Sequence, residues 1–479
     1  MNILIIHPAH KNNFHLDLLN QGYCEFIESL YEEGAHKVDI RNLDAEFHGM
    51  LEDPKDLPKR PFRKNFLEEA ENLDLLIKYL EGSEEQNLAA FLNDLFPSRA
   101  NGYDCIIFAI NWHRQILGGL VLAKYLKTAE NKIFYGNIVR HSSYRAVNLE
   151  AIRGKYGFID YLIESGRQKD VLQNIGITDK CPSPEKQADL LLGRKYRFVC
   201  FELEAGCFGK CMFCSNAKTA VMNEALFEKR LSRLKAISSI NKRIMFMQPS
   251  INPTRRYLRS FIDYIKQNNI DISWTSYAMC KNLDYPTLKE MYQIGCRLLE
   301  FGVESGSQKI VNYLQKGSKV DETAQILRDC RKAGIETCIF IMVSVPHETD
   351  EDFKQTLRFI KENEDYISHL DYDYFQVRYG SAMFNDPKKF GLSLRKSTPR
   401  DILKMTNNQE IPFDEIQGIS WEENLVRRRR RMEIMKRVTE NFKGRVYTTG
   451  VSMDGSERHG IFSWEDLFEN KYLRCLESV

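Results

Sequence analysis

The sequence predicts an α/β protein in which a doubly wound parallel sheet precedes a partial (β/α)6 barrel and a helical C-terminal region. Two observations carry this prediction. Apolar runs of strand length alternate with amphipathic helical stretches over most of the 479 residues, a pattern typical of right-handed βαβ units. A polar segment at 166–195 separates two such series. We therefore expect domains at 1–165 and 196–385, a linker at 166–195 and a helical region at 386–479.

Five apolar runs define a Rossmann-like first domain. A helical stretch around Leu18–Glu33 follows the first run, and such crossing helices should cover a parallel sheet on both faces. Residues 47–100 form a charged insertion in which we expect two surface helices. The expected strands are Asn2–His7, His36–Arg41, Tyr103–Ile110, Lys132–Gly136 and Phe158–Ile163.

The second series repeats strand then helix six times. One of its helices should have Asp321 as its N-cap and end at Gly334. Six units are too few to close an eight-stranded barrel, so we expect a three-quarter barrel with its site at the C-terminal ends of the strands. The expected strands are Tyr196–Glu204, Arg243–Pro249, Ile272–Met279, Arg297–Glu304, Glu336–Pro346 and Tyr372–Arg378.

The C-terminal region carries five consecutive arginines, Arg427–Arg431, in a helical pattern. Such a run could indicate nucleic-acid binding, but five consecutive residues of a helix point to every face of it. We therefore expect a helix that packs on the barrel with some of these arginines in ion pairs.

The composition favours neither a nucleic acid nor a membrane as partner. Lys plus Arg number 68 and Asp plus Glu 66, so there is no strong charge imbalance. The start, MNILIIHPAH, lacks the features of a signal peptide, and no apolar run reaches the ~20 residues that span a bilayer. We expect a cytoplasmic protein whose cysteines are thiols or metal ligands rather than disulfides. Cys296, Cys330 and Cys338 fit small buried side chains.

A C-x3-C-x2-C motif directly follows the first expected barrel strand. It places Cys207, Cys211 and Cys214 in ELEAGCFGKCMFCSN. Three thiolates leave one iron of a [4Fe–4S] cluster without a protein ligand, and that iron can bind the amino and carboxylate groups of S-adenosylmethionine. Reduction then cleaves the sulfonium C–S bond and releases a 5′-deoxyadenosyl radical. A zinc site is the alternative, but zinc generally takes four ligands, and the loop offers no fourth Cys or His.

The motif resembles the C-x3-C-x-Φ-C signature of the radical S-adenosylmethionine (SAM) superfamily, with Phe213 at the aromatic position. The stretch LEFGVESGSQ, residues 299–308, is similar to the fourth-strand signature of this family. The resemblance implies that Phe213 lies near the adenine of SAM. It implies that Glu304 and Ser305 lie near the methionyl or ribose part.

Other strand ends depart from the family pattern. Residues 339–353, IFIMVSVPHETDEDF, resemble the fifth-strand stretch G-x-P-G-E-T that is associated with adenine binding, but Ser344 and His347 replace glycines. We expect His347 to be a solvent-facing loop residue rather than a proton carrier. The second strand lacks the usual Gly-Gly-Glu, so the backbone of Gln248–Ser250 should contact the SAM amino group. The remaining residues expected in the SAM site are Ser250, Ser276 and Arg378.

The first domain resembles the cobalamin-binding domain of the B12-dependent group, the class B methyltransferases and their relatives. The matching stretches are EEGAHKVDIRNLDA, YDCIIFAINWHRQ, NKIFYGN and YGFIDYLIESGR. The resemblance implies a corrin at the C-terminal strand edge, with Trp112 against its lower face and Gly136 and Asn137 beside it. The Asp-x-His-x-x-Gly motif for an axial histidine is absent. HPAHKNNFHLDLL also resembles flavodoxin-like quinone reductases, so a flavin, or an empty bracing sheet, is the alternative.

These resemblances imply a radical SAM enzyme, in first place a cobalamin-dependent methyltransferase acting on an unactivated carbon. Its partners would be a small-molecule or peptide substrate and a reductant such as flavodoxin or ferredoxin. Two alternatives stay open. One is a cobalamin-independent epimerase, cyclase or rearrangement enzyme, and the other is an iron–sulfur electron carrier without turnover.

Overall fold

The computed structural model divides into two compact units, residues 1–200 with 398–409 and residues 201–397 with 410–479. The described residues are 2–8, 37–43, 76, 78–83, 86–97, 101–110, 115–126, 131–136, 149–164, 199–201, 203, 207, 209–214, 224–246, 248–378, 380–395 and 411–448. The expected helix around Leu18–Glu33, the linker 166–195 and much of the insertion 47–100 lie outside them.

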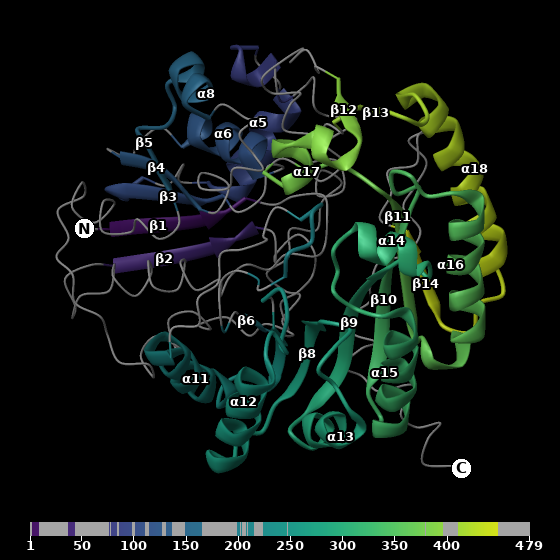
Figure 1. Ribbon diagram of the computed structural model, residues 1–479. Coiled ribbons are helices and arrows are strands. Elements are labelled where there is room, and N and C mark those ends of the chain that lie inside the picture. Colours follow the sequence, from purple (N-terminus) through teal and green to yellow (C-terminus); the bar gives the residue numbers. More distant parts are fainter. Residues whose placement is uncertain are drawn as a thin grey trace. The chain divides into compact units, whose positions relative to one another are not determined.

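The first unit contains a five-stranded sheet in the order β2-β1-β3-β4-β5 (Figure 1). All four neighbouring pairs are parallel. The order reverses between β1 and β3, which makes this pair the topological switch point. The strands are β1 (Asn2–His7), β2 (Lys37–Asn42), β3 (Cys105–Ala109), β4 (Asn131–Gly136) and β5 (Tyr161–Glu164). All five expected strands are therefore confirmed, with small shifts at their ends.

Apolar side chains explain how the helices of this unit pack. In α6 (Gln115–Tyr125) every residue except Lys124 is buried, so this helix lies within the core. Helices α5 (Gln86–Leu95) and α8 (Leu149–Tyr156) belong to the same unit. Helix α5 belongs to the charged insertion, yet its Leu88, Phe91 and Leu92 are buried in the same core as Phe108 of β3. The expectation of a mere surface helix was wrong there, because one face of α5 is apolar.

The second unit contains a seven-stranded sheet in the order β14-β11-β10-β9-β8-β7-β6. The strands are β6 (Val199–Phe201), β7 (Arg243–Phe246), β8 (Ser273–Ala278), β9 (Cys296–Glu304), β10 (Glu336–Val343), β11 (His369–Tyr374) and β14 (Arg445–Thr448). The pairs from β7 to β14 are parallel. The six expected strands are present, and β14 is an addition that pairs with β11.

The expectation of a helical C-terminal region was only partly right, because this region also contains strands. Besides α18 (Trp421–Thr439) it contributes β14 and the antiparallel pair of β12 (Leu392–Leu394) and β13 (Phe413–Glu415). These strands are only three or four residues long, too short for a periodic pattern to reveal them.

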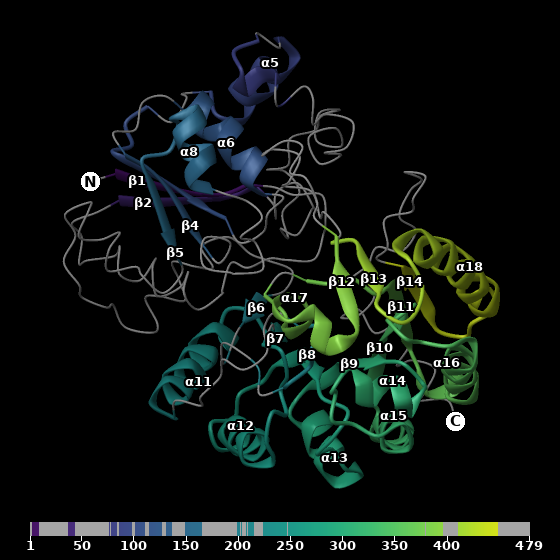
Figure 2. The same ribbon diagram turned by 45° about the horizontal axis from the view of Figure 1, so that its top comes forward.

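The main helices of the second unit lie on the outer side of its sheet (Figures 1 and 2). Helix α12 illustrates the packing, because its Phe261 meets Phe246 of β7 and Trp274 of β8 edge to face. These helices are α11 (Glu224–Ser238), α12 (Arg255–Gln267), α13 (Tyr285–Gln293), α15 (Val320–Ala333) and α16 (Asp350–Glu362). Short helices α14 (Gln308–Tyr313) and α17 (Ala382–Asn385) follow β9 and β11.

The sequence predicted one end of α15 correctly and the other only approximately. Gly334 ends the helix in the left-handed conformation, with a φ of 85°, as expected. The N-cap is Lys319 rather than Asp321. Asp321 lies in the first turn, where a carboxylate still stabilises the free N–H groups.

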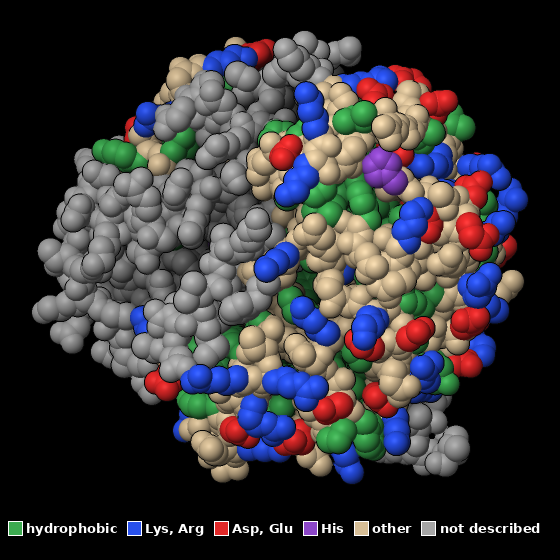
Figure 3. Space-filling model, viewed as in Figure 1, with side chains coloured by type: hydrophobic (Ala, Val, Ile, Leu, Met, Phe, Trp, Pro, Cys, Tyr) green, Lys and Arg blue, Asp and Glu red, His purple; other side chains and the backbone are tan. Residues whose placement is uncertain are grey.

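Charges of both signs are mixed on the surface of the second unit. On the face shown in Figure 3, described Lys and Arg side chains are interspersed with Asp and Glu. Among the described helices, none is long and apolar enough to cross a membrane.

Acidic side chains lie on the inner face of the second sheet. Glu300 of β9 pairs in register with Tyr277 of β8 and Cys338 of β10, and Phe340 pairs with Asp371 of β11, so these side chains share a face. Glu300 and Asp371 are 4% and 8% exposed. Burial, reinforced by repulsion from Asp371, raises the pKa of Glu300 to about 8. This carboxyl is therefore mostly protonated at neutral pH.

We expect Glu300→Gln to flatten the dependence of stability on pH. The folded pKa of Glu300 is raised from 4.5 to about 8, so the folded state keeps a proton that the unfolded chain releases. The stability that this carboxyl contributes is full below its unfolded pKa and is lost as the pH rises through the folded value, by on the order of a few kcal/mol. Urea unfolding of cluster-free protein at about pH 5 and about pH 8 measures the difference. The exposed Glu362→Gln is the control, and an unchanged slope in Glu300→Gln would contradict the prediction.

Candidate functional site

The three cysteines of the motif lie on one loop after β6. The Cys207, Cys211 and Cys214 side chains are partly buried. The backbone N–H of Gly209 donates to Sγ of Cys207 at 3.2 Å. A Cβ added to Gly209 would lie 3.1 Å from Sγ of Cys207 and 3.7 Å from Sγ of Cys211. Only glycine therefore leaves the space between these two sulfurs open.

Burial raises the pKa of the Cys207 and Cys211 thiols. At Cys207 the N–H of Gly209 opposes this rise, and at Cys211 the charge of Lys316 opposes it. In the described part of the chain, no group of three or more His, Cys, Asp and Glu side chains is arranged to hold a metal ion.

Backbone hydrogen bonds anchor the centre of the cysteine loop at Met212. Its N–H donates to the carbonyl of Leu314 at 3.2 Å, and its carbonyl accepts from the N–H of Met383 at 3.1 Å. The Met212 side chain is 4% exposed in a core cluster that includes Leu314, Val345 and Met383. The position of the cysteines is thus tied to the segments that follow β9, β10 and β11.

A buried ion pair lies beside this loop. The Lys316 ammonium is 2.9 Å from Oε1 of Glu304, and their side chains are 17% and 8% exposed. Lys316 also lies 5.7 Å from the centre of the Phe213 ring. A Cβ added to Gly302 would come within 2.5 Å of Glu304 and 2.8 Å of Lys316, so this glycine leaves room for the pair.

Electrostatics keep Lys316 charged in this position. Burial lowers its pKa, but attraction by Glu304 and by the Cys211 thiolate outweighs burial and raises the pKa above its usual value. Lys316 carries no signal in the sequence, because it comes 12 residues after Glu304 in an ordinary LQKG segment. Only the chain reversal through α14 brings the two together.

The serines after β9 hold the loop instead of facing the cysteines. The hydroxyl of Ser305 is 2.9 Å from that of Thr356 on α16 and accepts from the N–H of Ser307. The Ser307 hydroxyl donates to Asp352 at 2.7 Å. Ser305 as a cofactor contact stays a prediction, and in the structure its hydroxyl has hydrogen-bond partners within the protein.

Asn252 joins the loops that follow β7 and β8. Its amide donates to the carbonyls of Met279 and Lys281, and its oxygen accepts from the N–H of Met279 and the hydroxyl of Ser250. The expected site residue Ser250 therefore supports a turn. The Cε atom of Met279 is 3.6 Å from a Cβ added to Gly209, so these loops border the cysteines.

Two further expected site residues are Ser276 and Arg378, whose cofactor contacts stay predictions. Ser276 pairs in register with Phe246, which packs against α12. Ser276 is therefore on the helix-facing side of the sheet, and Thr275 and Tyr277 are on the inner side. Arg378 is exposed and lies beyond β11, which ends at Tyr374. The expected sixth strand was placed too far along the chain.

The loop after β10 retains a glycine-like backbone without glycine. Ser344 and His347 both have a φ of 61°, in the left-handed region that costs other residues free energy. We expected His347 to face solvent, but both of its ring nitrogens have partners in the protein. Its Nε2 is 3.0 Å from the carbonyl of Phe390, and its Nδ1 is 3.3 Å from Glu415. The side-chain hydrogen bond with Glu415 outweighs burial and raises the pKa of His347.

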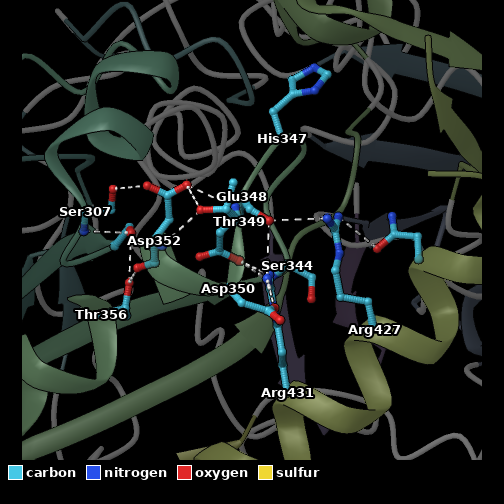
Figure 4. Close-up of polar contacts among 12 residues, drawn as sticks. Ser307, Ser344, His347, Glu348, Thr349, Asp350, Asp352, Thr356, Arg427 and Arg431 are labelled. Carbon is cyan, nitrogen blue, oxygen red and sulfur yellow. Dashed lines mark hydrogen bonds and ion pairs between the residues drawn. The ribbon is translucent and has the colours of Figure 1, made fainter. Parts of the chain in front are cut away.

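The side chains of Arg427–Arg431 point to different faces of α18, and some of them form ion pairs. This confirms the expectation for this helix. Arg427 pairs with Glu415 at 2.8 Å. Arg431 pairs with Glu348 at 2.5 Å (Figure 4). Arg428 donates to the carbonyl of Phe375. Arg429 and Arg430 are exposed.

Little of the first unit's expected site falls within the described residues. Gly136 is the last residue of β4, and its neighbour in register is Glu164, the last residue of β5. Trp112 and Asn137 lie outside the described residues.

Comparisons with known proteins place this site in a family. Residues 202–360 match the model of the radical SAM superfamily. An uncharacterised methyltransferase of Pyrococcus horikoshii is 27% identical over 219 residues, 43% of this chain and 45% of that protein. The bacteriochlorophyllide d C-8(2)-methyltransferase of Chlorobaculum tepidum is 24% identical over 204 residues, 39% of this chain and 44% of that protein. The chain thus spans less than half the length of these relatives.

A solved structure extends the likeness in fold. The radical SAM methyltransferase TsrM from Kitasatospora setae, with cobalamin and a [4Fe–4S] cluster bound, superimposes with a TM-score of 0.53. The match covers 83% of this chain and 81% of that one at 13% identity, so it shows a shared fold. The family model and the shared fold together identify residues 202–360 as a radical SAM domain.

Proposed function

We propose that the protein is a radical SAM enzyme that cleaves S-adenosylmethionine at a [4Fe–4S] cluster bound by Cys207, Cys211 and Cys214, and that it methylates an unactivated carbon with the help of cobalamin. The observation that carries the proposal is the three-thiol loop beside the buried pair of Glu304 and Lys316.

The residues present fit a four-iron cluster. Such a cluster spreads its thiolates over separate irons, unlike a single ion. Gly209 leaves the space between Cys207 and Cys211 free, where any Cβ would crowd the first sulfur at 3.1 Å. When bound, the cluster and S-adenosylmethionine would supply the radical, and cobalamin would supply the methyl group.

The chain's own residues would bind and orient S-adenosylmethionine. Glu304 offers a carboxylate to the amino group, and Lys316 offers an ammonium to the carboxylate of the methionyl part. Their mutual pairing at 2.9 Å keeps both charges balanced before binding. Phe213 presents an aromatic face next to Lys316. By resemblance, the loop of residues 344–349 would lie against the adenine.

The first unit would bind the corrin at its C-terminal strand edge. Its strand order of β2-β1-β3-β4-β5 creates a switch point at which flat cofactors bind. The same order suits a flavin, so topology alone leaves both cofactors open. The fold shared with cobalamin-bound TsrM over most of the chain favours cobalamin.

A cobalamin-independent radical enzyme is the second candidate, because the sequence lacks the Asp-x-His-x-x-Gly motif that supplies an axial histidine. A small molecule or peptide would be the substrate in either case, and a flavodoxin or ferredoxin the reductant. Formation of 5′-deoxyadenosine under reducing conditions separates both candidates from an electron carrier without turnover.

Each of Cys207→Ala, Cys211→Ala and Cys214→Ala should lose most of the iron after anaerobic reconstitution and abolish S-adenosylmethionine cleavage. The reason is that a cluster with two protein ligands is poorly held. Iron and sulfide analysis with a 5′-deoxyadenosine assay measures both effects. Cys296→Ala, at a fully buried cysteine of β9, is the matched control and should retain its iron. Full iron content in any of the three variants would show that the ligand is misassigned.

Glu304→Gln should weaken S-adenosylmethionine binding by about tenfold and leave the iron content unchanged. The amide keeps the size and an acceptor for Lys316 but loses the charge, and a charge-assisted hydrogen bond contributes ~1.5 kcal/mol or more. Equilibrium binding to the reconstituted protein measures the effect. Glu362→Gln, the same change at an exposed glutamate at the end of α16, is the control. An unchanged affinity would remove Glu304 from the proposed site.

The protein should retain close to one cobalt per chain after incubation with hydroxocobalamin and desalting. Trp112→Ala should lower that value, because the resemblance places Trp112 against the lower face of the corrin. Cobalt analysis and the absorption spectrum measure the outcome, and the spectrum also reveals a flavin. Absence of cobalt in protein whose iron–sulfur site is filled would favour the cobalamin-independent candidate.

A further inference from the structure

We propose that Arg431 of α18 is a positioning residue that holds residues 344–349 in the conformation required by the adenosyl part of S-adenosylmethionine. This inference rests on the proposed function. It assigns a role to one arginine of the C-terminal helix, far in sequence from the cysteine motif.

Arg431 makes three contacts with the segment after β10. Its guanidinium donates to Oε2 of Glu348 at 2.5 Å, to the carbonyl of Glu348 at 3.2 Å and to Asp350 at 2.9 Å (Figure 4). The Arg431 and Glu348 side chains are 3% and 0% exposed. The planar guanidinium thus fixes both the side chain and the backbone of Glu348, which a lysine could not do in the same way.

Glu348 passes this constraint to the strained part of the loop. The same Oε2 accepts from the N–H of Ser344 at 2.9 Å, and the N–H of Glu348 donates to the carbonyl of Val345. Ser344 and His347 both hold a φ of 61°, which unsupported loops avoid. The Arg431–Glu348 pair therefore provides the contacts that keep this conformation.

A second tether reinforces the first from the same helix. Arg427 donates to the carbonyl of Glu348 at 3.4 Å and to Glu415 at 2.8 Å. Glu415 in turn faces His347 at 3.3 Å. Both sides of the loop are therefore connected to α18 through alternating positive and negative groups.

The loop that Arg431 holds packs on the cysteine loop. Val345 is fully buried in the core cluster that includes Met212, the residue between Cys211 and Phe213. The loop proposed to contact the adenine and the cysteine loop are thus packed in the same core cluster. Loosening residues 344–349 should impair contacts with the adenosyl part, whereas the backbone anchors of Met212 to Leu314 and Met383 remain.

Fragment binding to the reconstituted full chain tests the inference. We expect Arg431→Met to weaken binding of S-adenosylmethionine and of 5′-deoxyadenosine by about ten- to a hundredfold, as for other supporting residues behind a ligand site. Binding of L-methionine and the iron content should stay at the parent level. The affinity of Arg431→Lys for 5′-deoxyadenosine should lie between those of Arg431→Met and the parent. Arg430→Met, at the exposed neighbouring arginine, should match the parent.

An unchanged affinity for 5′-deoxyadenosine in Arg431→Met, or an equal loss of methionine binding and iron, would overturn the inference. If Arg431→Met does not fold, Glu348→Gln replaces it, because the amide keeps an acceptor for Ser344 and Arg431 but removes the charge. It should show the same selective loss, smaller in size, and parental 5′-deoxyadenosine binding in this variant would overturn the inference. Failure of the parent chain to bind S-adenosylmethionine would instead refute the proposed function, and the inference with it.

Discussion

The buried pair of Glu304 and Lys316 is the constraint on which the strand-end site depends. Two opposite charges removed from water cost free energy unless they are well paired, and these two lie 2.9 Å apart with little exposure. The pair requires a position without a side chain at Gly302 and a positive φ at Glu304. It also places a cation beside Phe213 and Cys211. The charge balance of the site is therefore built into the end of one strand.

Polar residues at the other strand ends mainly connect loops to one another. Asn252 joins the loops after β7 and β8, Ser305 and Ser307 join the loop after β9 to α16, and α18 holds the loop after β10. Loops at the edge of a barrel carry many backbone groups that need partners. Side chains that satisfy those groups connect the loops to one another, as Ser250 and Ser305 do.

The two units differ in what they offer a cofactor. The second contributes charged and sulfur-bearing side chains from a loop and from a strand end. The described part of the first contributes a parallel sheet whose core is mainly apolar, with His7 and Gln115 as buried polar residues. The C-terminal edge of such a sheet is where open α/β folds bind their ligands. This difference fits the proposed division, in which one unit binds a small charged molecule and the other a large planar one.

The sequence by itself determined the fold class, the strands of both sheets except β14, and the loop with the three cysteines. Those features depend on local periodicity and spacing, as in β1, which spans Asn2–His7 as expected. Only the tertiary structure decided that Lys316 meets Glu304, that Ser276 faces a helix and that Arg431, but not Arg430, is buried against Glu348. Strand β14 is a further feature that only the tertiary structure decided. Its four residues are too few for a periodic pattern, and they form a strand by pairing with β11. The physical reason is common to all four. Partners distant in the chain, and the face on which a side chain emerges, are fixed by register and helix rotation in the packed molecule, which a linear pattern does not contain.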